Sequence, residues 1–373
     1  MRTFIVALAA AFGATTGAIA QQIVFEAAPG YRFSEYSSQI AVAPDETGAV
    51  LLVSADRAEQ KPSRVEFVRL DRDGKVLGRR LVMEGPAKPY GLHYNTRLAP
   101  LRSGEMILAL SSELDANSAP TSLGGLLRLS SSGEVLNRVR LPFPNYASAE
   151  MRKTHVLEIA TAKATADNGV VLGGGYGPGP STWWMAKFSA KGVRLAEDGS
   201  RKVRIPAAVD AIAPLPGGDW QAIVRDRTAD ERTTDVVLLR YDATGTRQSR
   251  RVLLERSESH FAAFTPEGRP MIVKADAPRL QLFDDGGASS REIPWPGMRP
   301  RKLIADDQGF LALFEKSQGR AEGQILRIDR EGSVVWRSPP GNYIDVVSAG
   351  GETRALALDA EGGSASYLRL TSR

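Results

Sequence analysis

The stretch RVEFVRLDRDGKVLGRRLVMEG (64–85) decides the fold, because other parts of the chain repeat its pattern. An apolar run leads into Asp71-Arg72-Asp73-Gly74, and a second short apolar run follows. Taken alone, the two carboxylates suggest a metal loop or a pair of catalytic acids. The same residues also suit a corner between two strands, since Asp hydrogen-bonds the backbone ahead and Gly adopts a positive φ.

Six other segments have the same shape, although the acids are not kept in them. They are GGLLRLSSSGEVLNRVRL (124–141), WWMAKFSAKGVRL (183–195), VVLLRYDATGTRQSRRVLL (236–254), RLQLFDDGGASSREI (279–293), QILRIDREGSVVWRS (324–338) and SYLRLTSR (366–373). The corners therefore fall at Asp71, Ser130, Ser189, Asp242, Asp284, Asp329 and Thr371. Because Ser and Lys replace the acids in sibling corners, we interpret Asp71–Gly74 as a structural turn and predict no metal there.

A second motif, a glycine turn followed by an apolar strand, precedes each corner. Its marker glycines are Gly48, Gly104, Gly169, Gly218, Gly268, Gly309 and Gly351. They are separated by about 50 residues on average, the length of a four-stranded propeller blade. Each unit then contains a short strand before the glycine, a strand after it, a third strand that enters the corner and a fourth that leaves it.

The two ends of the chain predict how the ring closes. The last unit stops after its third strand, whereas IVFE (23–26) resembles the fourth strands RRLVME and RRVLLE. We expect 23–26 to pair with the 364–370 strand and complete the seventh blade, which removes exposed sheet edges. The predicted fold is all-β: one seven-bladed β-propeller domain over 21–373, made of four-stranded blades and closed by the N-terminal strand.

These repeats resemble those of bacterial exported propellers with PQQ-like or WD40-like repeats. The nearest local match is ILRIDREGSVVW (325–336), which is similar to the quinoprotein repeat, and the resemblance extends over nearly all of 21–373. Quinone-dependent members typically carry a cofactor pocket with a vicinal cysteine pair. The chain has no cysteine, so we expect no bound quinone or other cofactor.

Residues 1–20 have the features of a secretory signal peptide: Arg2, an apolar stretch, and Ala18-Ile19-Ala20 before the cleavage point. We therefore expect a periplasmic or secreted protein that begins at Gln21. The net charge is +5 with the two signs interspersed. This pattern favours neither nucleic-acid binding nor membrane insertion, and we expect a monomer.

The connections between units supply the candidate ligand-binding residues. Three histidines lie before or at the start of a first strand, and could surround the axis as metal ligands or a proton relay, or be isolated structural residues. Aromatic residues in the same loops suit contact with a glycan or a protein, or they pack between blades. The predicted set is Tyr90, His93, Tyr94, His155, Tyr176, Trp183, Trp184, His260 and Trp295, with Tyr31, Phe33 and Tyr36 between the last and first units.

No catalytic residue is assigned, because the standard nucleophile, zinc and phosphate-loop motifs are missing from the sequence. The preferred hypothesis is an exported, non-enzymatic binding or scaffold propeller that presents a loop-rich face to a protein or glycan. The alternative is a propeller enzyme of the lactonase, hydrolase or quinoprotein type. Propeller sites gather residues from distant blades, so a missing motif leaves this alternative open.

Overall fold

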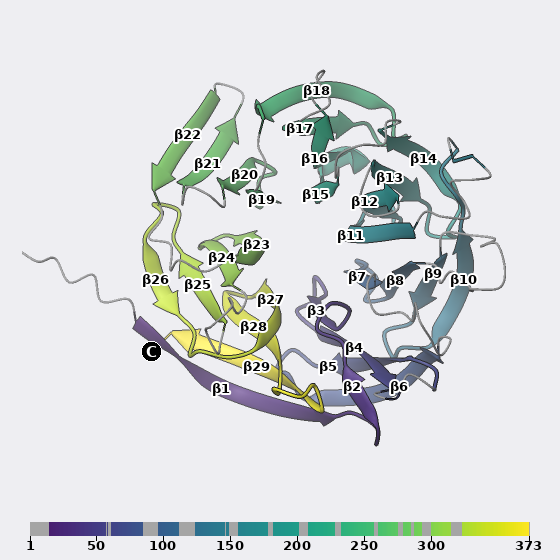
Figure 1. Cartoon of the computed structure of the whole chain (residues 1–373), viewed down its shortest axis with the longest axis vertical. Helices are drawn as coiled ribbons and strands as arrows, with labels where there is room; N and C mark the ends of the chain where they lie inside the picture. The colour runs from purple at the N-terminus through teal and green to yellow at the C-terminus, as the bar shows by residue number, and fades with distance from the viewer. Residues whose placement is uncertain are drawn as a thin grey trace, which may run out of the picture.

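A computed structural model shows seven antiparallel blades arranged in a ring (Figure 1). It describes residues 15–372 except 57, 59–60, 85–95, 112–123, 146, 149–155, 178–181, 201–207, 228–232, 257–259, 275–278, 285–286, 293–299 and 315–322. The described part of the chain contains one short 3-10 helix, η1 (Pro216–Gly218), and no helix that could cross a membrane. The fold predicted from the repeats is confirmed.

Each blade runs from an innermost first strand to an outermost fourth strand. Blades 1 and 2 are β3 (Gln39–Val42), β4 (Gly48–Asp56), β5 (Arg64–Leu70), β6 (Val76–Glu84) and β7 (Thr96–Pro100), β8 (Met106–Ser111), β9 (Gly124–Leu129), β10 (Val135–Leu141). Blades 3 and 4 are β11 (Val156–Ala164), β12 (Val170–Gly177), β13 (Trp183–Phe188), β14 (Arg194–Gly199) and β15 (Val209–Pro214), β16 (Trp220–Arg227), β17 (Thr234–Tyr241), β18 (Arg247–Leu254).

The remaining blades follow the same order. Blades 5 and 6 are β19 (His260–Phe264), β20 (Pro270–Lys274), β21 (Arg279–Asp284), β22 (Gly287–Glu292) and β23 (Pro300–Asp306), β24 (Gly309–Phe314), β25 (Gln324–Ile328), β26 (Val334–Arg337). Blade 7 is β27 (Tyr343–Ala349), β28 (Glu352–Leu358), β29 (Ser364–Ser372) and β1 (Thr15–Glu26). One extra strand, β2 (Tyr31–Phe33), pairs with β4 where the sequence predicted only a connection.

Apolar faces of neighbouring blades pack against each other and form the core. All nine residues of β4 are buried, whereas most of β6, at the rim of the same blade, is exposed. Each core cluster takes residues from two blades: Leu51 and Phe67 of blade 1 pack with Leu108 of blade 2, for example. A blade cannot bury both faces alone, so the ring is the smallest unit in which every blade is covered.

The corner between the third and fourth strands is a tight turn, as predicted. The Gly74 N–H donates to the Asp71 carbonyl at 3.0 Å, and the Asp71 carboxylate accepts from the Lys75 N–H at 2.7 Å. Gly74 has a φ of 84°, which favours glycine. In the sibling corner the hydroxyl of Ser130 accepts from the Glu134 N–H at 3.0 Å. Thr371 differs, because it lies inside β29 and the chain does not turn there.

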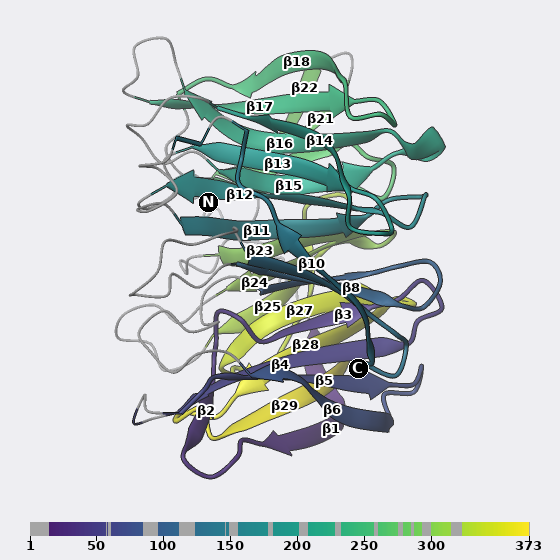
Figure 2. The same cartoon turned by 90° about the vertical axis from the view of Figure 1, so that its right-hand side faces the viewer.

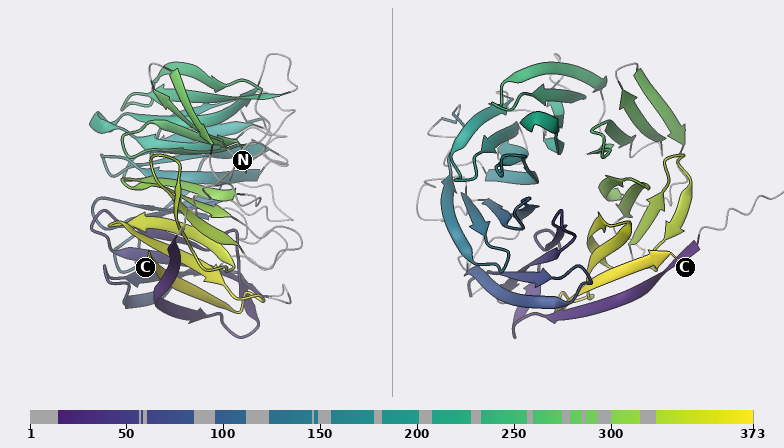
Figure 3. Two further views of the ribbon diagram at one scale, coloured as in Figure 1. Left: turned by 90° about the vertical axis from the view of Figure 1, so that its left-hand side faces the viewer. Right: turned by 180° about the vertical axis from the view of Figure 1, so that it is seen from behind.

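The ring closes through β1, which lies along the outside of β29 (Figures 1 and 3). Ile23 lies opposite Tyr367 and Phe25 opposite Ala365, which confirms the predicted pairing. The strand is longer than predicted, because it begins at Thr15 and also pairs with β26 of blade 6. Residues 15–20 thus lie in β1, although the sequence assigns them to a signal peptide, and cleavage after Ala20 stays a prediction.

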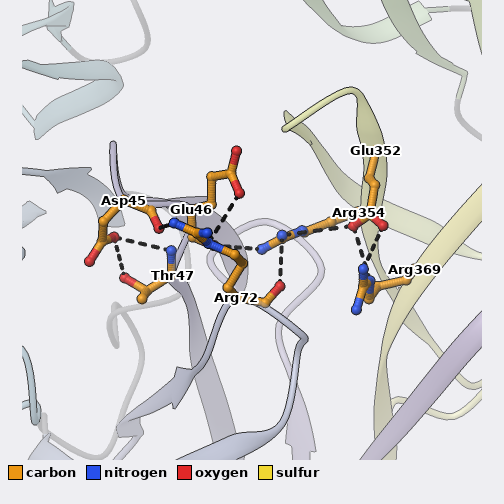
Figure 4. Close-up of polar contacts among 7 residues, drawn as sticks. All are labelled: Asp45, Glu46, Thr47, Arg72, Glu352, Arg354 and Arg369. Atoms are coloured by element: carbon orange, nitrogen blue, oxygen red, sulfur yellow. Dashed lines mark hydrogen bonds and ion pairs between the residues drawn. The ribbon is translucent and has the colours of Figure 1, made fainter.

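Two arginine side chains of blade 7 also donate hydrogen bonds to backbone carbonyls in the turns of blade 1 (Figure 4). Arg354 of β28 is 2% exposed and donates to the carbonyls of Glu46 at 3.0 Å and Arg72 at 3.1 Å. Arg369 of β29 is bonded to Glu352 and donates to the Asp73 carbonyl at 2.6 Å. Both arginines therefore hold the last blade to the first across about 300 residues of sequence.

Candidate functional site at the propeller axis

The first strands of the seven blades form a closed inner ring. Each one contacts the first strand of the next blade, and β27 of blade 7 contacts β3 of blade 1 (Figures 1 and 3). They all run from the face opposite the corners, here called the start face, to the corner face. Figure 2 shows the strands running across the thickness of the ring between these faces. A side chain exposed on a first strand therefore faces the axis.

Charged side chains gather on this inner ring. Short charged interruptions occur in otherwise apolar strands, as in TRLAP (96–100), PRKLIAD (300–306) and YIDVVSA (343–349). The set is Arg97, Glu158, Lys163, Asp210, His260, Arg301, Lys302, Asp306 and Asp345. No metal site follows from it, because no three His, Asp or Glu residues in the described ranges are grouped to hold an ion.

Asp345 of β27 connects three consecutive blades. Its carboxylate accepts from Lys302 Nζ of blade 6 at 2.5 Å and from the Ile40 N–H of blade 1 at 2.9 Å. Asp345 is only 6% exposed, and Lys302 also donates to the Val346 carbonyl at 3.1 Å. The ion pair satisfies both groups, as a buried carboxylate requires.

Arg97 of β7 joins blade 2 to blade 3. Its Nε donates to the Ala160 carbonyl of β11 at 2.7 Å, and its Nη1 donates to the Thr96 carbonyl at 2.7 Å. Burial lowers the pKa of Arg97, and the negative charges of Asp345 and Glu158 oppose that shift. Arg97 is therefore held among charges contributed by blades 3 and 7.

Lys163 of β11 is one of the inner-ring cations that form no ion pair with a carboxylate in the described ranges, as are Arg97 and Arg301. It is exposed and makes no hydrogen bond or ion pair with any residue in the described ranges. Desolvation by the surrounding blades lowers the pKa of Lys163, and the positive charge of Lys302 lowers it further. The Lys163 side chain is exposed on a strand that lines the axis, where the neighbouring blades partly desolvate its ammonium group.

Asp210 forms a separate cluster between blades 4 and 5. Its two oxygens contact Arg225 Nε at 3.1 Å and His260 Nε2 at 2.8 Å. The His260 side chain has no exposed surface. The imidazole therefore joins two blades and is closed to solvent in this arrangement.

An exposed aromatic residue lies on the start face, just before β3 of blade 1. Tyr36 is 57% exposed, and the guanidinium of Arg301 from blade 6 lies 5.6 Å from the centre of its ring. Arg301 also donates to the Glu35 carbonyl. The cation–π contact and the neighbouring hydrogen bond hold Tyr36, which precedes blade 1, against Arg301 of blade 6.

The predicted ligand-binding residues divide into two groups. Tyr90, His93, Tyr94, His155 and Trp295 lie outside the described residues. Tyr176, Trp183, Trp184 and His260 are at most 7% exposed.

The buried aromatic residues are core members. Tyr176 and Trp184 lie in the cluster between blades 2 and 3, and Trp183 lies in the cluster between blades 3 and 4. The Trp183 indole donates to Asp226 at 3.1 Å. This is the packing arrangement that the sequence also allowed, and a ligand-binding role for these residues stays a prediction.

The charged residues of the inner ring, apart from His260, were not predicted from the sequence. The predicted site residues were histidines and aromatic residues in and next to the connections, whereas these charges occur singly inside the short first strands. Lys163 and Lys302 stand out once each first strand is known to lie at the axis. A charge inside an apolar innermost strand is the signal that could have identified them.

Comparisons with known proteins support the fold. No family model and no curated protein matches the chain. Among solved structures, virginiamycin B lyase from Staphylococcus aureus is 12% identical, with 94% of this chain and 99% of that chain covered and a TM-score of 0.54. The WD40 repeats of RRP9 are 11% identical, with 93% and 99% covered and a TM-score of 0.55.

A third similar structure is YCF48 bound to D1 peptide. It is 9% identical, with 93% of this chain and 94% of that chain covered and a TM-score of 0.51. At such identities the likeness concerns the fold and not the activity. The chain thus has the seven-bladed β-propeller fold found in WD40-repeat and virginiamycin B lyase structures.

Proposed function

We propose that this protein is an exported binding or scaffold propeller that holds a protein partner on its start face. The observation that carries the proposal is the exposed Tyr36 fixed against Arg301. Tyrosine and arginine are enriched among residues that dominate protein interfaces. Because Arg301 already orients the ring, binding would cost little side-chain entropy.

The fold supports a protein partner in general terms. Propellers of this fold include YCF48, whose structure contains D1 peptide. The D1 peptide is bound by YCF48, and the present chain is similar to YCF48 in fold only. A glycan is the second ligand class that an exposed, fixed tyrosine suits, since sugars stack on aromatic rings.

Photocrosslinking from the start face tests this proposal. A benzoyl-phenylalanine at position 36 should yield one discrete protein adduct in the cells that make this protein. The same group at Thr244, an exposed residue of the corner face, is the control and should not yield that adduct. A sugar-containing adduct at position 36 would replace the protein partner with a glycan. Equal labelling from both positions, or none from position 36, would contradict the proposal.

Export is part of the proposal and has its own test. The support is the sequence of residues 1–20. Fractionation should place the protein in the periplasm or medium, and N-terminal sequencing should begin at Gln21. A cytoplasmic protein that retains Met1 would contradict this part without affecting the start-face experiment.

A propeller enzyme of the lactonase, hydrolase or quinoprotein type is the second candidate. The specific observation in its favour is the set of charged inner-ring residues that six blades contribute, among them Arg97, Glu158 and Asp345. Elemental analysis and spectra of the purified protein separate the candidates. A stoichiometric metal or quinone, together with turnover of a lactone or ester, would favour the enzyme.

A further inference from the structure

Lys163 and Lys302 come from strands on opposite sides of the ring. Lys163 belongs to β11 of blade 3 and Lys302 to β23 of blade 6, and Figure 1 shows these strands facing each other across the axis. The positive charge of Lys302 lowers the pKa of Lys163. Two ammonium groups therefore approach the axis from opposite sides.

Lys163 and Lys302 differ in their ion-pair partners. Asp345 neutralises Lys302 at 2.5 Å, whereas Lys163 has no carboxylate partner in the described ranges. Of the strands packed against β11, β8 and β12 carry no charge. β7 contributes Arg97, another cation, and Asp210 of β15 is bonded to Arg225 and His260. Glu158, on β11 itself, interacts with Arg97.

Of the four carboxylates on the first strands, Asp210 and Asp306 are paired with Arg225 and Arg327. Among the described first-strand residues, only Glu158 and Asp345 are then left to oppose the four cations Arg97, Lys163, Arg301 and Lys302, which leaves a local positive excess. A partly desolvated ammonium group within such an excess is unfavourable without a counter-charge. An oxyanion between the two lysines would remove the repulsion and accept their hydrogen bonds.

We propose that the propeller axis binds a small oxyanion, a carboxylate or a phosphate, between Lys163 and Lys302. This site is separate from the start-face surface around Tyr36 and goes beyond the function proposed above. Lys163 would supply the main attraction because its charge is not already used by an acid. Lys302 would contribute a weaker attraction, since Asp345 shares its charge.

Calorimetric titration of the full chain at low ionic strength tests the site. Inorganic phosphate and citrate are titrated separately, so that the two arms distinguish phosphate from carboxylate chemistry. The wild type should bind at least one of them, and Lys163→Met should weaken binding at least tenfold. Lys191→Met is the matched control, because Lys191 is an exposed lysine of a corner in the same blade, and it should bind as the wild type does.

Two further variants make the outcome decisive. Lys163→Arg keeps the charge and should retain binding, which excludes a general folding defect as the cause of the loss. Tyr36→Ala should leave anion binding unchanged, so failure here is distinct from failure at the start face. The proposal is overturned if neither anion binds the wild type, or if Lys163→Met binds as tightly as Lys191→Met.

Discussion

Asp306 ends β23 at the boundary of blades 6 and 7, where it is bonded to residues of both. Arg327 of blade 6 contacts its two oxygens at 3.0 and 2.7 Å, and Ser348 of blade 7 donates to one of them at 2.5 Å. Burial acts to raise the pKa of Asp306, but the hydrogen bonds from Ser348 and Arg327 outweigh it, and the pKa is lowered overall. The ionised carboxylate is therefore the form that the fold stabilises.

Replacing Arg327 with Met should lower the free energy of unfolding by about 3 kcal/mol, because it leaves the Asp306 carboxylate partly buried without its main partner. Asp306→Asn in the same chain should restore part of that loss. Urea unfolding of the two single variants and the double variant measures the coupling. Additive single effects would show that the pair is not an energetic unit.

The same pair predicts a pH dependence. Because the folded pKa of Asp306 is lowered, its stabilisation is complete above the unfolded pKa of about 3.9 and is lost as pH falls through the folded value. The stability difference between wild type and Asp306→Asn should therefore shrink below about pH 4. Thermal unfolding of both proteins from pH 7 to pH 3 checks this, and a constant difference would contradict it.

The charged form of Lys163 should destabilise the fold, whereas the charged form of Asp306 stabilises it. Its folded pKa is lowered, so the unfolded chain binds more protons between that value and about 10.4, and stability rises with pH in this window. In a buffer without polyvalent anions, Lys163→Met should melt at a higher temperature than the wild type at pH 7. The gap should close as pH approaches 10, and a variant that melts lower at both pH values would contradict the expectation.

At the scale of the element, six of the seven third strands carry a cation two positions before the corner, and blade 5 has Leu282 there. In four blades this cation donates to a backbone carbonyl in the corner of the next blade: Arg128 Nη1 donates to Ala190 at 3.2 Å, and Lys187 Nζ donates to Ala243 at 2.7 Å. Arg69 donates to Ser131 and Arg369 to Asp73 in the same way. The full set in the sequence is Arg69, Arg128, Lys187, Arg240, Arg327 and Arg369.

Arg128→Met should cost about 2 kcal/mol, since it removes charged hydrogen bonds that join blades 2 and 3. Arg140→Met, on the exposed outer strand of the same blade, is the control and should change stability by less than about 0.5 kcal/mol. Guanidinium unfolding of both variants measures the difference. Equal effects would contradict a role for this cation between blades.

The sequence predicted the strands and corners because they depend on local patterns. Apolar runs and the Asp or Ser before Gly repeat within each unit, so every corner serves as a control for the others. The axial contacts could not be predicted in this way, since Asp345 with Ile40 joins residues 305 apart and requires the closed ring. β2 was missed because its pairing with β4 depends on a short, three-residue segment with no period to detect.

For the whole molecule, stability depends on closure by β1. Phe25 is 4% exposed and packs in the cluster that blades 7 and 1 share, whereas Val24 of the same strand is 50% exposed. Phe25→Ala should therefore lower the free energy of unfolding by about 3 kcal/mol, and Val24→Ala should have little effect. Urea unfolding and limited proteolysis compare the pair, and equal resistance would show that β1 does not limit the stability of the ring.

The antiparallel pairing of β1 with β29 also sets the response to mechanical force. Gln21, where the exported protein is proposed to begin, lies opposite Arg369, so the start of β1 in that protein and the end of β29 lie at the same end of the pair. Tension between the termini loads these hydrogen bonds one after another, as in unzipping, and not all together in shear. Seven interfaces between blades stabilise the ring against denaturant, but the β1–β29 pair that closes it should separate at low force. An unfolding enzyme that pulls on either terminus would break this pair first.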